Sequence, residues 1–235
     1  MHQYFTFITA PYYLLVTEFL ARPQDVQTRS TLVLTQIDAG MLRLLGVRFV
    51  ITDDPGNFGR ELASLPLAEQ RPVRLIELDQ PNLGDYSPTS VKRAPDFHSG
   101  MELLHDPAFD GARTVVTDEV LDTNGLVAAT GVRLTYETYG FHIQAESTGR
   151  SILVLPPQFS RCWSAEGTGT PRLFRANLMQ LGLEFSGRLD ARLIFRYGPL
   201  FASTCRLADI ADIDRLKIAQ GRVLPRGAPF VPSRP

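Results

Sequence analysis

The sequence has little lysine, a single tryptophan and almost no net charge. Its 235 residues include 24 Lys and Arg against 25 Asp and Glu, which leaves a formal charge of -1. Proteins that bind nucleic acid usually carry a basic excess or a basic stripe, so the charge balance predicts no nucleic-acid partner. Lys92 and Lys217 are the only lysines, which we interpret as an arginine-rich coding bias rather than a functional signal.

Cysteine is also scarce. Cys162 and Cys205 are the only two, and no CxxC pair occurs. This excludes a small disulfide-stapled scaffold and a cysteine zinc site. The sequence leaves two possibilities open: a pair of buried free thiols, which we favour because free cysteine is usually buried, or one disulfide formed in an oxidising compartment.

Sequence motifs for the common enzyme classes are missing. There is no GxSxG elbow, no HExxH pair and no Walker or Rossmann glycine spacing, so no cofactor is expected and we lean against an enzyme. Asp96, His98, His105 and Asp106 form a short cluster. We interpret it as the end of a helix, where a histidine meets the negative helix terminus, rather than as a metal site.

No apolar run is long enough to cross a membrane. Residues 1–17 lack Asp, Glu, Lys and Arg, but polar residues and Pro11 interrupt them, and a spanning helix needs about 20 apolar residues. A basic region and a cleavage site typical of a signal peptide are also missing. We expect an ordinary helix with Pro11 in its first turn and Pro23 just past its end, and with an apolar stripe at Tyr12, Leu15, Val16 and Phe19.

The strongest positive signal is a β-rich run over residues 132–197. Apolar and polar side chains alternate there with period two in four segments, which predicts strands with one buried and one wet face. The apolar members are Phe141, Ile143 and Ala145; Phe174, Ala176 and Leu178; Leu181, Leu183 and Phe185; and Ala191, Leu193, Phe195 and Tyr197. With a turn expected at residues 186–188, the pattern indicates two packed sheets.

The first half of the chain instead alternates helix and strand. We expect strands at residues 30–35, 47–52, 73–78 and 113–119, a short extended piece from Val91, and irregular chain at 55–72 and 81–90. Asp38 is positioned to cap one short helix, with Gly46 after its end, and Asp96 or Ser99 to cap a second that Pro107 stops. The predicted fold class is α+β: a small α/β lobe over 1–122, an antiparallel, jelly-roll-like β-sandwich over 123–200, and an irregular tail over 201–235 that packs on the sandwich.

Aromatic and polar residues in the sandwich form the candidate ligand site. Sugars bind by stacking a ring face on an aromatic plane while polar groups bind the hydroxyls, and five residues could do this: Tyr136, Tyr139, His142, Arg161 and Trp163. The competing interpretation, which we favour for the tryptophan, is that Trp163 fills the core between the sheets.

Acidic pairs provide the alternative of a carbohydrate-active hydrolase. Asp53 and Asp54 follow one predicted strand, and Asp118 and Glu119 end another. Both pairs are also ordinary turn chemistry, which we favour. A third possibility is a purely structural interaction domain without a small ligand.

Three segments carry a resemblance to a known family. They comprise residues 44–51 (LLGVRFVI); residues 87–116, with the run DPAFD followed by RTVV; and residues 149–197, with GRSILVL, Trp163, Arg-Ala-Asn at 175–177 and Phe-Arg-Tyr at 195–197. In order and spacing they resemble the C-terminal extracytoplasmic portion of YfhO-type bacterial membrane proteins, relatives of the GT-C membrane glycosyltransferases.

The resemblance implies a location and a role. The chain would lie on the extracytoplasmic side, tethered to the membrane region of a parent protein, as an accessory module of an enzyme that handles lipid-linked sugars. It would bind or position a glycan or a protein partner. The family's known catalytic acids lie between membrane spans, so the resemblance places none on this chain.

Overall fold

The computed structural model describes residues 25–28, 31–67, 70–169, 171–196 and 204–215. The predicted helix after Pro11 lies outside these residues. The elements of the first half are β1 (Val26–Thr28), β2 (Thr31–Val33), α2 (Ala39–Leu44), β3 (Phe49–Thr52), β4 (Arg60–Leu67), β5 (Gln70–Glu77), β6 (Ser90–Arg93), α3 (Phe97–His105) and β7 (Thr114–Thr117). Those of the second half are β8 (Thr130–Glu137), β9 (Gly140–Gln158), β10 (Trp163–Thr168), β11 (Arg172–Ala176), β12 (Gln180–Phe195) and α4 (Thr204–Arg215).

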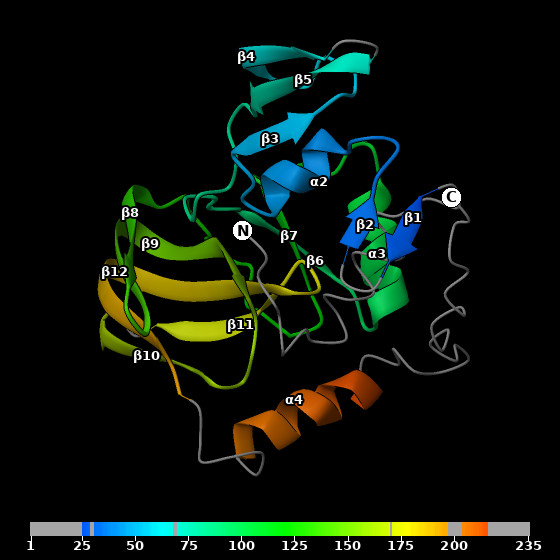
Figure 1. Ribbon diagram of the computed structural model, residues 1–235. Coiled ribbons are helices and arrows are strands. Elements are labelled where there is room, and N and C mark those ends of the chain that lie inside the picture. Colours follow the sequence, from blue (N-terminus) through cyan, green and yellow to red (C-terminus); the bar gives the residue numbers. More distant parts are fainter. Residues whose placement is uncertain (1–24, 29–30, 68–69, 170, 197–203, 216–235) are drawn as a thin grey trace.

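The second half is one five-stranded antiparallel sheet that folds over itself into a β-sandwich (Figure 1). Its strand order is β10-β12-β9-β8, and β11 pairs with the first part of β12 while β10 pairs with the last part. Apolar side chains from both parts of β9 and β12 meet in a single buried cluster, which contains Ile143, Leu153, Leu183, Phe185 and Leu193. The α+β fold class with a sandwich is therefore confirmed.

The expected turn at residues 186–188 is wrong. These residues lie inside β12, where the register against β9 shifts between Ser186 and Arg188, and Gly187 adopts the left-handed backbone with φ of +70°. A bulge of this kind bends a strand without ending it. Two predicted strands are thus one bent strand, and the bend lets β12 contribute to both layers.

The outer face of one layer is covered by the α/β part of the chain. Ile152 and Val154 on β9 join Phe174 on β11 in a second buried cluster with Val115 of β7. Gly182 lies under the Phe174 ring, where a Cβ atom would collide with the ring. The two predicted lobes thus share core contacts across the expected boundary at residues 122 and 123.

α3 packs on the body of the protein through an apolar stripe. The Asp96 carboxylate accepts from the Ser99 backbone N–H at 2.8 Å and caps the helix, as predicted. Phe97, Met101 and Leu104 lie on its buried face, as the 3.6-residue period requires. α2 is capped by Asp38 in the same way.

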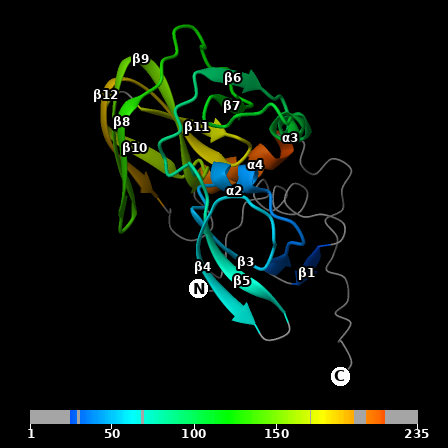
Figure 2. The same cartoon turned by 90° about the horizontal axis from the view of Figure 1, so that it is seen from above.

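The sheet β3-β5-β4 protrudes from the rest of the molecule (Figures 1 and 2). The prediction of irregular chain over 55–72 is wrong, because β4 and the start of β5 form a hairpin there. Every residue of β4 is exposed, so no buried face imposes the alternation that would predict a strand. Ile51 and Leu65 on this sheet are 75% and 63% exposed.

The predicted C-terminal tail contains a helix longer than the one or two turns expected from Ile210 and its neighbours, because α4 runs for 12 residues. Among the described residues, no helix is long and apolar enough to cross a membrane.

Candidate functional site

Four aromatic rings form a continuous row at one end of the sandwich. Tyr136 of β8 lies opposite Phe141 of β9, and Trp163 of β10 lies opposite Phe195 of β12. The ring centroids are 5.1 Å apart for Tyr136 and Phe141, 5.3 Å for Phe141 and Trp163, and 4.9 Å for Trp163 and Phe195. We call these four residues the aromatic row.

Exposure changes along the aromatic row. Phe141 and Trp163 are partly buried and pack against the sandwich core, and the Trp163 indole N–H donates to the Gln158 carbonyl at 2.9 Å. Tyr136, at the edge strand, is 70% exposed. Trp163 therefore closes the end of the core, while Tyr136 presents an aromatic surface to solvent.

Tyr139 is 80% exposed but lies in the turn between β8 and β9, outside the aromatic row. Its backbone carbonyl accepts from the Phe195 N–H at 3.3 Å. Its ring is a separate exposed surface close in sequence to Tyr136.

His142 points to the opposite face of the sheet. Its Nε2 lies 2.8 Å from Asp190 Oδ1, and the Gln144 amide donates to Asp190 Oδ2 at 2.9 Å. The hydrogen bond with His142, then that from Gln144, lowers the pKa of Asp190. His142 thus belongs to the polar outer face, as the period-two alternation requires, and does not face Trp163.

Arg161 also lies apart from the aromatic row. Its Nε donates to Asp212 Oδ2 at 3.0 Å, and its guanidinium lies 5.3 Å from the centroid of the Phe159 ring. It belongs to a group of charges beneath α4.

That group, which we call the ionic cluster, contains two carboxylates and three guanidinium groups: Asp118, Asp212, Arg161, Arg175 and Arg215. The Arg175 side chain is 5% exposed and pairs with Asp212 and, at 3.5 Å, with Asp118. Arg215 pairs with Asp118 at 2.5 Å. Buried charges are tolerated only when they are paired in this way.

The protonation of Asp212 follows from these neighbours. Burial raises the pKa of this carboxyl, but the hydrogen bond from Arg161 and the charges of Arg175, Arg161 and Arg215 outweigh burial, and the pKa is lowered. A general acid needs a raised pKa so that it carries a proton at neutral pH. Asp212 is instead a charged structural partner.

The acids that the sequence offered for hydrolysis do not form one pair. Asp118 lies in the ionic cluster, and Glu119 pairs with Arg172 at 3.0 Å, so the interpretation of these two as turn residues misses their ion pairs. Asp54 follows β3 of the protruding sheet, and its carboxylate accepts from the Gly56 N–H at 2.7 Å, which is turn chemistry. Within the described residues, no group of three or more His, Cys, Asp or Glu is placed to bind a metal.

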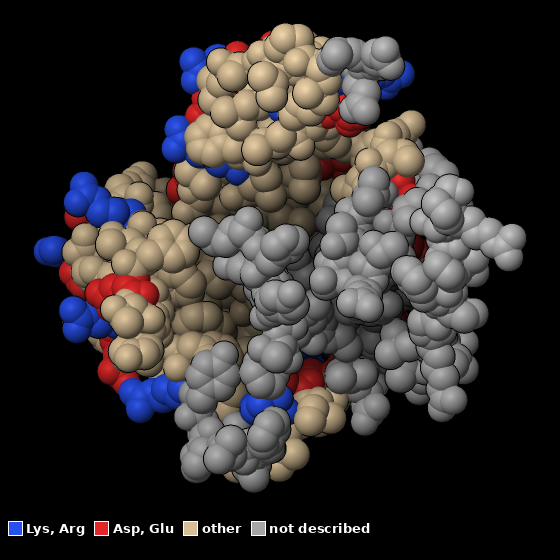
Figure 3. All heavy atoms as spheres, in the orientation of Figure 1, with Lys and Arg blue, Asp and Glu red and all other residues tan. Residues whose placement is uncertain are grey.

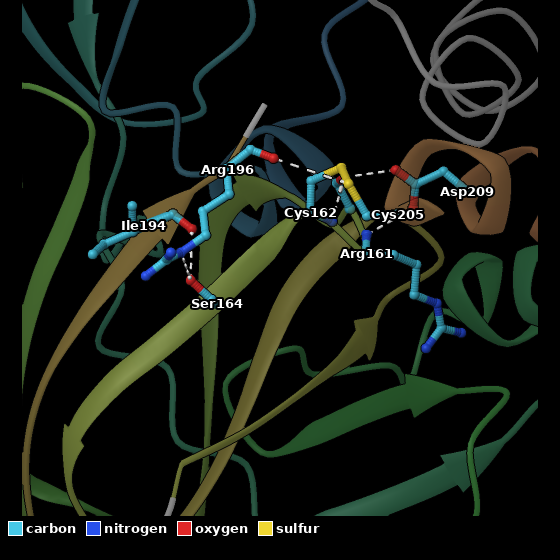
Figure 4. The surroundings of a disulfide bond; sticks show 8 residues. Arg161, Cys162, Ser164, Ile194, Arg196, Cys205 and Asp209 are labelled. Atoms are coloured by element: carbon cyan, nitrogen blue, oxygen red, sulfur yellow. Dashed lines mark hydrogen bonds between the residues drawn. A yellow bond between two sulfur atoms is a disulfide. The ribbon is translucent and has the colours of Figure 1, made fainter. Parts of the chain in front are cut away.

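A disulfide joins Cys162 to Cys205 and fixes the start of α4 to the start of β10 (Figure 4). Beside it, Asp209 of α4 accepts from the Ser160 hydroxyl at 2.6 Å and from the Arg161 backbone N–H at 2.7 Å. The pair of free thiols that we favoured is therefore wrong, because α4 brings Cys205 against Cys162 from 43 residues away in sequence. The spacing of Asp209 and Asp212, three apart on one helix face, was the available sequence signal for this attachment.

Comparisons of the chain with protein-family models, curated proteins and solved structures find no match.

Proposed function

We propose that this chain is a non-catalytic, extracytoplasmic binding module that contacts a glycan through the exposed end of the aromatic row. The observation that carries the proposal is the ring of Tyr136, which is 70% exposed and rests against Phe141 at 5.1 Å. The contact with Phe141 fixes the orientation of the Tyr136 ring before binding. The ring therefore offers a flat apolar surface that suits the face of a sugar ring.

The disulfide supports the proposed location. Disulfides persist in oxidising compartments and are rare in the reducing cytosol, and Cys162–Cys205 joins two segments 43 residues apart in sequence. The resemblance to the extracytoplasmic portion of YfhO-type proteins points the same way. It also names the membrane region of a parent protein as the partner, and a lipid-linked sugar as the glycan.

The test is a glycan array, followed by titration of any bound glycan against the purified chain and two variants. Tyr136→Ala removes the exposed ring of the aromatic row and should weaken binding about 10-fold. Tyr139→Ala removes a tyrosine of similar exposure outside the row and is the matched control.

Three outcomes oppose the proposal. Equal losses in the two variants would show that the row itself is not the surface. An array on which no glycan is retained would leave the interaction domain as the better description. Cleavage of a bound glycan, abolished by neutralising one acidic side chain, would establish the hydrolase instead.

A further inference from the structure

A pocket of about 370 Å³ lies between α2 and the loop that follows α3. Its volume falls within the roughly 300–1,000 Å³ of small-molecule sites. None of its lining residues belongs to the aromatic row or to the ionic cluster.

The inner wall of the pocket is apolar. Met41, Leu44 and Leu104 are buried members of the core cluster beneath α2 and α3, and Tyr86 and Phe109 pack against that cluster. The Tyr86 hydroxyl donates to the Gln80 carbonyl at 2.8 Å, so that its polar end is already bonded. The wall therefore offers apolar and aromatic surface to a ligand.

Three carboxylates line the same pocket, and each is fixed by the backbone. One oxygen of Asp38 accepts from the Met41 N–H at 2.9 Å, one of Asp106 from the Ala108 N–H at 2.9 Å, and one of Asp110 from the Ala112 N–H at 3.0 Å. Because these bonds set the orientation of each carboxylate in advance, less conformational entropy is lost when a ligand binds.

Arg43 supplies a donor without an acceptor. Its Nε atom is buried and has no hydrogen-bond partner among the residues that the structure describes. Its guanidinium also forms no ion pair there, although three carboxylates line the same pocket. A buried donor without a partner is costly, and an acceptor on a bound ligand would remove that cost.

We propose that this pocket binds one neutral sugar residue. Lys92 pairs with Asp106 at 3.7 Å and Arg113 with Asp110 at 3.4 Å. With Arg43, these cations balance the three carboxylates, so the pocket favours neither an anionic nor a cationic ligand. Sugar hydroxyls donate to the carboxylates and accept from Arg43 at the same time, while the ring face packs on the wall formed by Tyr86 and Phe109. The inference extends the proposed function to a second contact with glycan, on residues that the aromatic row does not use.

The experiment titrates the full chain with a panel of neutral hexoses and N-acetylhexosamines, followed by calorimetry or by NMR. Arg43→Met removes the donors, and Asp110→Asn removes one charge while it keeps the oxygen that accepts from Ala112. Each should weaken binding at least 10-fold. The exposed residues Arg93 and Asp79 supply the controls Arg93→Met and Asp79→Asn, for which we expect unchanged affinity.

The outcomes separate this inference from the proposed function. Monosaccharide binding that both pocket variants lose and Tyr136→Ala keeps would support the pocket. Sugar binding that only Tyr136→Ala weakens would overturn the pocket and leave the aromatic row in place. Absence of monosaccharide binding, or preferential binding of a free amino acid or an organic anion, would also overturn it. Melting curves establish that each variant is folded, and if one pocket variant does not fold, the other provides the test.

Discussion

The helices α3 and α4 both lie against the body of the protein, but opposite kinds of chemistry attach them (Figure 1). α3 buries Phe97, Met101 and Leu104, and Gly100 brings its backbone so close to Leu178 that a Cβ atom would collide. α4 leaves Leu207 and Ile210 57% and 58% exposed. It is attached by the disulfide, by Asp209 and by the ionic cluster.

The difference shows that an apolar attachment such as that of α3 tolerates more substitutions than an ionic attachment such as that of α4. Burial of an apolar stripe is non-directional and works for many sequences. An ionic cluster tolerates few changes, because removing one charge leaves its partner buried and unpaired. On the face that Figure 3 shows, charged side chains are scattered in small groups. Arg175, Asp118 and Asp212 of the ionic cluster are 10% exposed or less, so they contribute little to the surface.

Arg175→Met should have the largest effect. The side chain is 5% exposed, and its removal leaves Asp118 and Asp212 with fewer cations, at a cost of about 3–5 kcal/mol in the free energy of unfolding. Urea denaturation measures it. Arg172→Met is the control: this arginine is 51% exposed, and its loss should cost about 1 kcal/mol or less. Similar costs for the two variants would contradict a buried ionic attachment.

Leu104→Ala tests the apolar attachment of α3. Truncation of a buried leucine should lower the free energy of unfolding by about 2–5 kcal/mol. Leu207→Ala makes the same change on the exposed face of α4 and should cost less than about 0.5 kcal/mol. The contrast between the helices fails if the two substitutions are equally costly in urea denaturation.

The double variant Cys162→Ser, Cys205→Ser should lower the free energy of unfolding by about 2–4 kcal/mol, because the disulfide restricts the unfolded chain. We expect the loss to concentrate in α4, because the exposed residues Leu207 and Ile210 add little apolar attachment. Hydrogen exchange should accelerate at residues 204–215 and remain slow in α3. Uniform acceleration of both helices would show instead that the disulfide stabilises the whole fold.

A fall in pH should produce the smallest effect. The pKa of Asp212 is lowered in the folded chain, so its contribution to stability is complete above the ordinary value near 3.9 and is lost as the pH falls through the lowered value. Hydrogen exchange in α4, corrected for intrinsic rates, should increase below about pH 4. Asp212→Asn should show fast exchange in α4 already at neutral pH, and a wild-type-like rate in that variant would refute the role of this carboxylate.

Much of the fold could be predicted because burial leaves a periodic pattern. Alternation located the sandwich strands, and Asp38 and Asp96 located two helix starts. β4 was missed because neither of its faces is buried. The bend at Gly187 was taken for a turn, because a left-handed glycine serves in both a hairpin turn and a bulge.

The candidate site was harder to predict than the fold. Tyr136 and Trp163 do belong to one aromatic row, but Phe141 and Phe195, which complete it, were treated only as core positions. His142 lies elsewhere because it follows Phe141 on β9 and points to the opposite face of the strand. Arg161 lies in the turn before β10 and pairs with Asp212. The cysteine pair and the ionic cluster join residues from distant segments. The spacing of Asp209 and Asp212 indicates one polar helix face, but it does not show which segment that face contacts.

The bend in β12, and the pairing of β9 along its whole length, have a consequence for how the sandwich forms. Because the same two strands run through both layers, neither layer can be completed alone, and the layers must assemble and melt as one cooperative unit. Pairing between residues far apart in the chain raises contact order and slows folding. This half of the protein should therefore fold slowly and without a stable, partly folded intermediate.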